Sequence, residues 1–218
     1  MIVVRQKKLE DIQAEIAPYK RVLLVGCNTC AAVALAGGEN ETSRMASTLR
    51  LRNAREGGDK EYSFTVLQRQ CEPEFLEELD HSEADVILSL GCGAGVALLS
   101  EIIAKPIMPA LDTLFIGAAR GYGSWRAECS ACGNCVLDQT GGVCPVTRCA
   151  KGIMNGPCGG VDNGKCEVDP NQECAWVTIY DRMEDLGRSE DAEKIIEPRD
   201  FSRRITCRAW GLPEGGSK

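Results

Sequence analysis

The sequence predicts an α/β protein, with a parallel, three-layer sheet domain followed by a small cysteine-rich subdomain. Buried-strand patterns alternate with helical patterns over residues 1–120. The composition changes after Arg120: the stretch 129–174 contains eight glycines and three prolines but few apolar runs. Eight of the 13 cysteines lie in that stretch. We therefore divide the chain into an α/β domain (1–120), a cysteine-rich domain (121–180) and a C-terminal docking tail (181–218).

The overall composition is that of a globular protein of moderate size. A chain of 218 residues is long enough for one domain with its own core plus an appendage. Its residues are 44% apolar and 26% charged, which is typical of a globular protein. The net charge is −7 and no basic block stands out, so nucleic acid is not an expected partner. The apolar stretch Val86–Ala104 contains three glycines and passes from β-branched to helix-forming residues. It is expected to be a buried strand leading into a helix, and not a membrane span.

Each secondary-structure element of the first domain is predicted from its own pattern. Strands that alternate with helices favour a parallel sheet with right-handed crossovers, and we expect the strand order 2-1-3-4 of a flavodoxin- or Rossmann-like domain. The predicted strands are Arg21–Val25, Tyr62–Leu67, Asp85–Leu90 and Asp112–Ile116, and the predicted helices are Lys7–Ile16, an alanine-rich helix after Cys30, Glu41–Arg55, Glu72–Leu79 and Val96–Ala104.

Four cysteines follow the carboxyl ends of the predicted strands. Cys27 and Cys30 come after the first strand, Cys71 after the second and Cys92 after the third. The carboxyl edge of such a sheet is where ligands bind, and neighbouring strands lie about 4.8 Å apart. The four thiols can therefore converge on one inorganic group, with helix N-termini nearby to favour thiolates. The alternative is that they are ordinary buried cysteines, which pack as small hydrophobic residues.

The segment "LSLGCGAG" (88–95) also resembles a nucleotide-binding glycine loop. It follows the third strand and not the first, its middle position is a cysteine, and the next strand ends in "IGAAR" without the acidic residue that would hold a ribose. Nucleotide binding is therefore the weaker interpretation.

The cysteine count and spacing favour metal or cluster ligation over disulfides. Residues 1–11 lack the apolar region of an export signal, so a reducing cytoplasmic location is expected. The three thiols of Cys129-x2-Cys132-x2-Cys135, followed by Cys144 before a proline, partly match the ferredoxin pattern, although the last gap is longer. Zinc sites more often combine Cys-x2-Cys pairs with histidine, and the only histidine, His81, lies far away in the sequence.

Twelve cysteines are therefore predicted ligands of two or three [4Fe–4S] clusters, with zinc in one site as an alternative. The pairing among the eight later cysteines stays open between a sequential grouping and an interleaved, ferredoxin-like one. Cys207 is the expected non-ligand, and Trp125 and Trp176 are expected to cover the cysteine-rich segment. The predicted ligands are Cys27, Cys30, Cys71, Cys92, Cys129, Cys132, Cys135, Cys144, Cys149, Cys158, Cys166 and Cys174.

Four motifs make the chain resemble the family described as the C-terminal domain of methylenetetrahydrofolate reductase. They are "VGCNTC" (25–30), "SLGCGAG" (89–95), "CSACGNC" (129–135) and, most specific, "CPVTRCAKGIMNGPCGG" (144–160), within a resemblance that runs from about residue 22 to 180. Free-standing members look like the small iron–sulfur subunit that accompanies the flavin-bearing reductase in acetogenic bacteria. A folate- or flavin-binding barrel is not expected in this chain.

The resemblance implies an electron-transfer subunit that is not catalytic alone. Ferredoxin, or a hydrogenase or heterodisulfide-reductase-type subunit, would supply electrons for the flavin of a neighbouring reductase, where methylenetetrahydrofolate becomes methyltetrahydrofolate in one-carbon metabolism. The alternative function is a structural zinc-binding subunit of the same complex. In the tail, Phe201, Ile205 and Trp210 are candidate anchors on the reductase, with a solvated helix and an extended end as the simpler interpretation.

Overall fold

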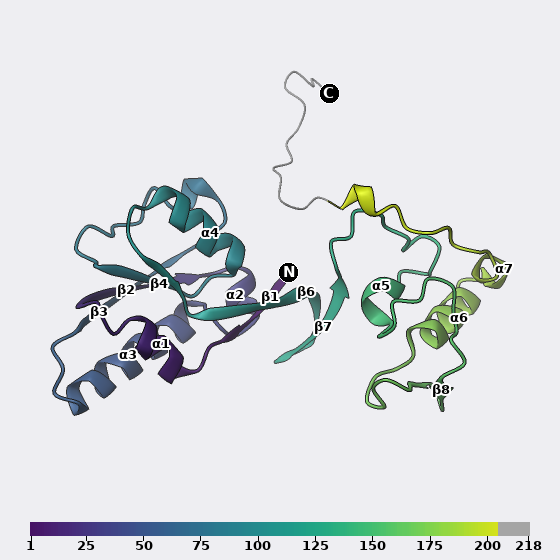
Figure 1. The fold of residues 1–218 in the computed structure, drawn as a ribbon, viewed down its shortest axis with the longest axis horizontal. Helices are drawn as coiled ribbons and strands as arrows, with labels where there is room; N and C mark the ends of the chain where they lie inside the picture. Colours follow the sequence, from purple (N-terminus) through teal and green to yellow (C-terminus); the bar gives the residue numbers. More distant parts are fainter. Residues whose placement is uncertain (205–218) are drawn as a thin grey trace, which may run out of the picture. The chain divides into compact units, whose positions relative to one another are not determined.

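The computed structural model describes residues 1–204, and its contacts divide the chain into two compact units (Figure 1). The first unit is Met1–Arg126 and the second is Ala127–Lys218. The first is a mixed α/β unit, and the second holds all eight of the later predicted ligands. The predicted anchors Ile205 and Trp210, and the predicted non-ligand Cys207, lie outside the described residues.

A parallel four-stranded sheet forms the centre of the first unit, with the order β3-β2-β4-β5. The order of the first three predicted strands, 2-1-3, is confirmed. All three pairings are parallel, and β2 is buried from its second residue to its end. Such uninterrupted burial is typical of a central strand covered on both faces. The strands are β2 (Arg21–Cys27), β3 (Glu61–Leu67), β4 (Val86–Ser89) and β5 (Ile107–Pro109).

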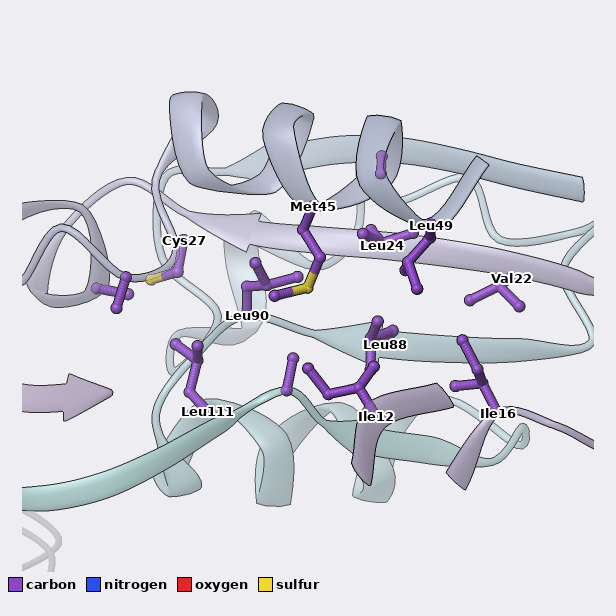
Figure 2. Packing of buried hydrophobic residues seen from close by; sticks show 14 of the residues in the cluster. Ile12, Ile16, Val22, Leu24, Cys27, Met45, Leu49, Leu88, Leu90 and Leu111 are labelled. Atoms are coloured by element: carbon purple, nitrogen blue, oxygen red, sulfur yellow. The ribbon is translucent and has the colours of Figure 1, made fainter. Parts of the chain in front are cut away.

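Side chains alternate along β2 between two hydrophobic clusters. Val22 and Leu24 pack in a cluster with residues of helices α1 and α3, as Figure 2 shows in part. Leu23 and Val25 pack in a second cluster with residues of helix α4. Successive strand residues point to opposite faces, so one apolar run serves both clusters. The helices are α1 (Leu9–Glu15), α2 (Cys30–Val33), α3 (Glu39–Arg55) and α4 (Gly93–Ile102).

The predicted fourth strand, Asp112–Ile116, is wrong as a member of the parallel sheet. These residues belong to β6 (Leu111–Gly121), which pairs antiparallel with β1 (Ile2–Gln6). Together with β7 (Ser124–Cys129), the two strands form a second sheet of order β1-β6-β7. The fourth place in the parallel sheet is taken by β5, which ends at Pro109. Proline lacks an N–H donor, so it is compatible with this edge position.

Two predicted helices are shorter than expected. Glu72–Leu79 contains only a 3₁₀ turn, Pro73–Phe75, although Leu76 and Leu79 are buried as the helical pattern requires. So short a segment gains little from helical hydrogen bonds and is ordered here by burial of its leucines. The alanine-rich helix is the single turn α2, since Leu35 adopts a positive φ of 55° immediately after it.

The second unit is built around helix α6 (Ala175–Asp185), and the predicted boundary at residue 180 falls inside it. Trp176, Ile179 and Met183 on one face of α6 form a small core with Val136 and Ile196. This core forms because α6 supplies an apolar face just beyond the glycine-rich stretch. The other elements are α5 (Pro145–Arg148), β8 (Val161–Asp162), β9 (Lys165–Cys166), α7 (Ser189–Ala192) and a 3₁₀ turn (Phe201–Arg203).

Two further findings bear on the sequence-based expectations. Within residues 1–204, no helix combines the length and the apolar character that crossing a bilayer requires.

At the amino end of the parallel sheet, the Arg21 guanidinium donates to the Asp85 carboxylate at 2.7 Å, and the backbone N–H of Arg21 donates to it at 2.9 Å. These hydrogen bonds lower the pKa of Asp85 to about 2. The pair ties the start of β2 to the start of β4. The three-layer, flavodoxin- or Rossmann-like arrangement stays a prediction.

Replacement of Leu24 tests the parallel sheet as the source of stability. Leu24 is fully buried between the sheet and α3, so Leu24→Ala is expected to lower the free energy of unfolding by about 2–5 kcal/mol. Leu51→Ala is the matched control: Leu51 lies on α3 with 68% of its surface exposed, and its loss should cost less than about 0.5 kcal/mol. Chemical denaturation followed by circular dichroism measures both, and equal losses would contradict the assigned core.

Candidate metal centres

The structure places the strand-end cysteines at the carboxyl edge of the parallel sheet. Cys27 is the last residue of β2, Cys30 begins α2, and Cys92, three residues after the end of β4, is the N-cap of α4. Cys71 follows β3 by four residues and is exposed. The edge is therefore occupied by thiols from three adjacent strands, as the sequence predicted from their positions.

The ionisation of Cys71 depends on two of the other thiols at this edge. Partial burial of the Cys71 thiol raises its pKa, and the neighbouring thiols of Cys92 and Cys27 raise it further because like charges disfavour ionisation. Two of the cysteines also act on Arg69. The pKa of Arg69 is raised chiefly by its ion pair with Glu72, and to a smaller extent by Cys71 and Cys30. Cys27 and Cys92 thus interact electrostatically with Cys71, and Cys30 and Cys71 both interact with Arg69.

A buried glutamine fixes the loop that carries Cys71. Gln70 is 1% exposed, and its amide donates to the carbonyls of Val25 and Gly26 at 2.7 and 3.0 Å. Its amide oxygen accepts from the Ser89 hydroxyl at 2.6 Å. A Cβ on Gly91 would stand 2.4 Å from that same oxygen, so only glycine allows this approach. The end of β2, the end of β4 and the Cys71 loop are thereby joined by one side chain.

Cys27 and Cys92 differ in environment. Cys27 is only 6% exposed and packs in the hydrophobic cluster with Leu90 and Leu111, while its thiol lies 3.5 Å from the Thr29 hydroxyl (Figure 2). Cys92 is half-buried and is the N-cap of the ten-residue helix α4. Cys27 therefore contributes to packing as well as to the thiol group at the edge.

In the second unit, a buried arginine links the first cysteine triplet to α5. Arg148 is 6% exposed and its guanidinium lies 4.0 Å from the Glu128 carboxylate. Glu128 precedes Cys129, the first of the triplet, and Arg148 precedes Cys149. Cys144 is the N-cap of α5, and Pro145 occupies the first helical position. The ion pair consequently holds the start of the triplet loop near the short helix that Cys144 begins.

The later four cysteines line one small cavity of about 20 Å³. They reach it from separate segments: Cys149 ends α5, Cys158 lies in the glycine-rich loop, Cys166 ends β9 and Cys174 is the N-cap of α6. None of the first four cysteines of this unit lines the cavity. The structure thus brings together Cys149, Cys158, Cys166 and Cys174 as one set.

The walls of this cavity are mainly apolar. Ile153, Val161, Ala175 and Trp176 line it with the four cysteines. The indole N–H of Trp176 donates to the Ile153 carbonyl at 2.8 Å, which fixes the ring in place. Trp176 therefore covers the cysteine set, as expected, whereas Trp125 lies on β7 in the first unit and lines a different groove.

The donor set fits an iron–sulfur group. Four thiols without histidine, in an apolar cavity, are the ligand chemistry of [4Fe–4S] clusters, although tetrahedral Cys₄ zinc uses the same donors. Across the described part of the chain, no three His, Cys, Asp or Glu side chains have the geometry to hold a single metal ion. All twelve described cysteines are free thiols, so none is committed to a disulfide.

Several residues that organise these sites were not predicted from the sequence. Gln70, Arg148 and the pair formed by Lys151 and Glu167 each adjoin a cysteine in the sequence or in space. A polar residue directly beside a predicted ligand, as in "RQC" and "TRC", is the one signal that could have indicated the first two. His81 lies in the loop before β4, at the amino end of the sheet and away from the cysteine edge.

The glutamine network gives a direct test of the strand-edge geometry. Gln70→Ala leaves the Ser89 hydroxyl and two strand-end carbonyls without this partner, so the free energy of unfolding should fall by about 1–3 kcal/mol. Gln68→Ala, two residues earlier and exposed, is the matched control and should change it by less than about 0.5 kcal/mol. Denaturant unfolding measures both. Indistinguishable losses would show that Gln70 does not fix the Cys71 loop.

Comparison with known proteins gives one match. No curated protein and no solved structure matches the chain. Residues 108–202 match the family model described as "Methylene-tetrahydrofolate reductase C terminal". The matched region contains the eight predicted ligands of the second unit and begins after the four strand-edge cysteines. Over residues 108–202, the chain is therefore similar to the C-terminal region of methylenetetrahydrofolate reductase.

Proposed function

We propose that this chain is the iron–sulfur electron-transfer subunit of a methylenetetrahydrofolate reductase complex. The observation that carries the proposal is the apolar cavity lined by Cys149, Cys158, Cys166 and Cys174, inside the region that matches the reductase family. Thiolate-ligated clusters supply one-electron chemistry when bound. The single histidine, His81, lies away from the cysteines and offers them no acid–base group.

The cavity supports the sequential grouping of the eight later cysteines. The second set lines it together, while the first set, Cys129, Cys132, Cys135 and Cys144, lies outside it. The Glu128–Arg148 ion pair gives the first set a common anchor, because it holds the triplet loop near the helix begun by Cys144. Each set then offers four thiolates to one [4Fe–4S] cluster.

The strand-edge set provides a third site. Cys27 and Cys92 interact electrostatically with Cys71, Cys30 and Cys71 both interact with Arg69, and Cys92 is the N-cap of α4. Repulsion among these thiolates is relieved when a cationic inorganic group binds them, so the same proximity that raises the pKa of Cys71 favours ligation. Gln70 keeps the set in place with hydrogen bonds that do not involve the thiols.

The chain's own residues would exclude water and hold the ligands during electron transfer. Trp176 covers the cavity lined by Cys149, Cys158, Cys166 and Cys174, and its hydrogen bond to the Ile153 carbonyl fixes the ring there. A donor of the ferredoxin class, or a hydrogenase or heterodisulfide-reductase-type subunit, would deliver single electrons. Two such electrons and two protons convert methylenetetrahydrofolate to methyltetrahydrofolate at the flavin of the partner subunit, which carries the bond-making chemistry.

The tail offers one described candidate anchor for that partner. Phe201 is 69% exposed, and the Arg199 guanidinium lies 5.0 Å from its ring centre. An exposed aromatic side chain beside an arginine has the composition of a protein-interface anchor.

Metal analysis of three variants tests the proposal. Anaerobically purified wild-type protein should be brown and contain about twelve iron atoms per chain, four for each set of four cysteines. Cys158→Ala should lose about four of them, and Cys92→Ala a different four. Cys207→Ala is the matched control and should lose none. Iron, sulfide and zinc counts with a visible spectrum make the measurement.

Function is tested on the same preparations with the flavin-bearing partner. Reduced ferredoxin should reduce the partner's flavin through wild-type protein and through Cys207→Ala, and much more slowly through Cys158→Ala. A colourless wild-type protein that contains only zinc would instead establish the structural zinc subunit. Full flavin reduction after removal of the iron would refute the electron-transfer role.

A further inference from the structure

Two charged side chains of opposite sign lie beside Cys158. The Lys151 ammonium is 3.8 Å from the Cys158 thiol, and the Glu167 carboxylate is 4.0 Å from it. Lys151 and Glu167 also form an ion pair with each other. The three groups thus make a compact triangle at one corner of the cysteine-lined cavity, where Lys151 and Cys158 both contribute to the wall.

Backbone geometry fixes both charges. Lys151 follows Cys149 by two residues, in a turn closed by a hydrogen bond from Gly152 to the Cys149 carbonyl at 2.9 Å. The N–H of Glu167 donates to the Gly160 carbonyl at 3.1 Å. A Cβ on Gly160 would stand 2.2 Å from a Glu167 carboxylate oxygen, so the carboxylate lies directly over this glycine. The side chains are held partly in solvent, 40% and 45% exposed.

A charge this close to a ligand thiolate changes how easily an electron is accepted. Reduction adds one negative charge to the ligated group, so an adjacent ammonium favours the reduced form and an adjacent carboxylate disfavours it. Solvent screens both effects because the side chains are half-exposed. Their opposite signs make the pair nearly neutral as a whole, and removal of either member therefore leaves the other uncompensated.

We propose that Lys151 and Glu167 are positioning residues that set the reduction potential of the group held by Cys149, Cys158, Cys166 and Cys174. This inference rests on the proposed function and adds to it the residues that tune one site. Lys151 donates toward the Cys158 sulfur and holds its charge there through Glu167. The electron comes from a one-electron donor of the ferredoxin class, and the thiolates remain bound throughout.

Replacement of each charge should move the potential in opposite directions. Lys151→Gln leaves Glu167 beside the thiolate and should lower the equilibrium constant for one-electron reduction about tenfold, a shift of about 59 mV. Glu167→Gln leaves Lys151 uncompensated and should raise it by a similar factor. Lys151→Arg keeps the charge and should lie close to wild type. Anaerobic redox titration monitored by electron paramagnetic resonance measures all of them on the iron-loaded full chain.

The controls separate local tuning from a general effect of charge. Lys194→Gln removes the same charge elsewhere in the second unit, where Lys194 pairs with Asp191, and should leave every potential unchanged. Only one component of the titration should move in the Lys151 and Glu167 variants, while the others stay at their wild-type potentials. If Lys151→Gln fails to load iron, Glu167→Gln alone decides the question.

Failure of the inference and failure of the proposed function give different results. Wild-type protein without iron would remove the proposed function itself. Iron-loaded variants with unmoved potentials, or with all components moved equally, would overturn only the role of Lys151 and Glu167. Opposite shifts in one component, with Lys151→Arg near wild type, would establish it.

Discussion

The arrangement of this chain depends on bringing cysteine side chains close together, which costs free energy when neighbouring thiols ionise. At the strand edge, burial raises the pKa of the Cys71 thiol, and the neighbouring Cys92 and Cys27 raise it further. Such thiols do not stabilise one another, and none of the twelve described cysteines forms a disulfide. A fold that nevertheless gathers them must hold each thiol through its backbone, and both units do so with polar side chains that adjoin the cysteines.

The two units meet this constraint by different means. In the first unit a parallel sheet with two hydrophobic clusters supplies a rigid edge, and Gln70 locks the remaining loop to it. In the second unit the cysteines lie on short elements, and ion pairs hold the segments: Glu128 with Arg148 and Lys151 with Glu167. Both units also place a cysteine at the start of a helix: Cys92 is the N-cap of α4, and Cys174 is the N-cap of α6.

The sequence predicted what depends on local pattern and failed where pairing decides. The apolar runs of β2, β3 and β4 and their order were predictable, and so was the position of cysteines at their carboxyl ends. The fourth strand was misassigned because residues 112–116 have the same pattern in either sheet, and only the partner β1 determines which one they join. Gln70 and Lys151 were not predicted, since a polar residue near a cysteine is usually only solvated.

The first unit has a larger hydrophobic core than the described part of the second unit, so ligation of the thiols contributes differently to the stability of each unit. The first unit buries two clusters around β2 and β4, so its strand edge exists whether or not the thiols are ligated. Among the described residues of the second unit, five buried hydrophobic side chains form the cluster, and Cys149 and Cys174 themselves pack against it. Ligation of those thiols would therefore add to the core of the second unit directly, because the ligands and the apolar contacts belong to the same residues.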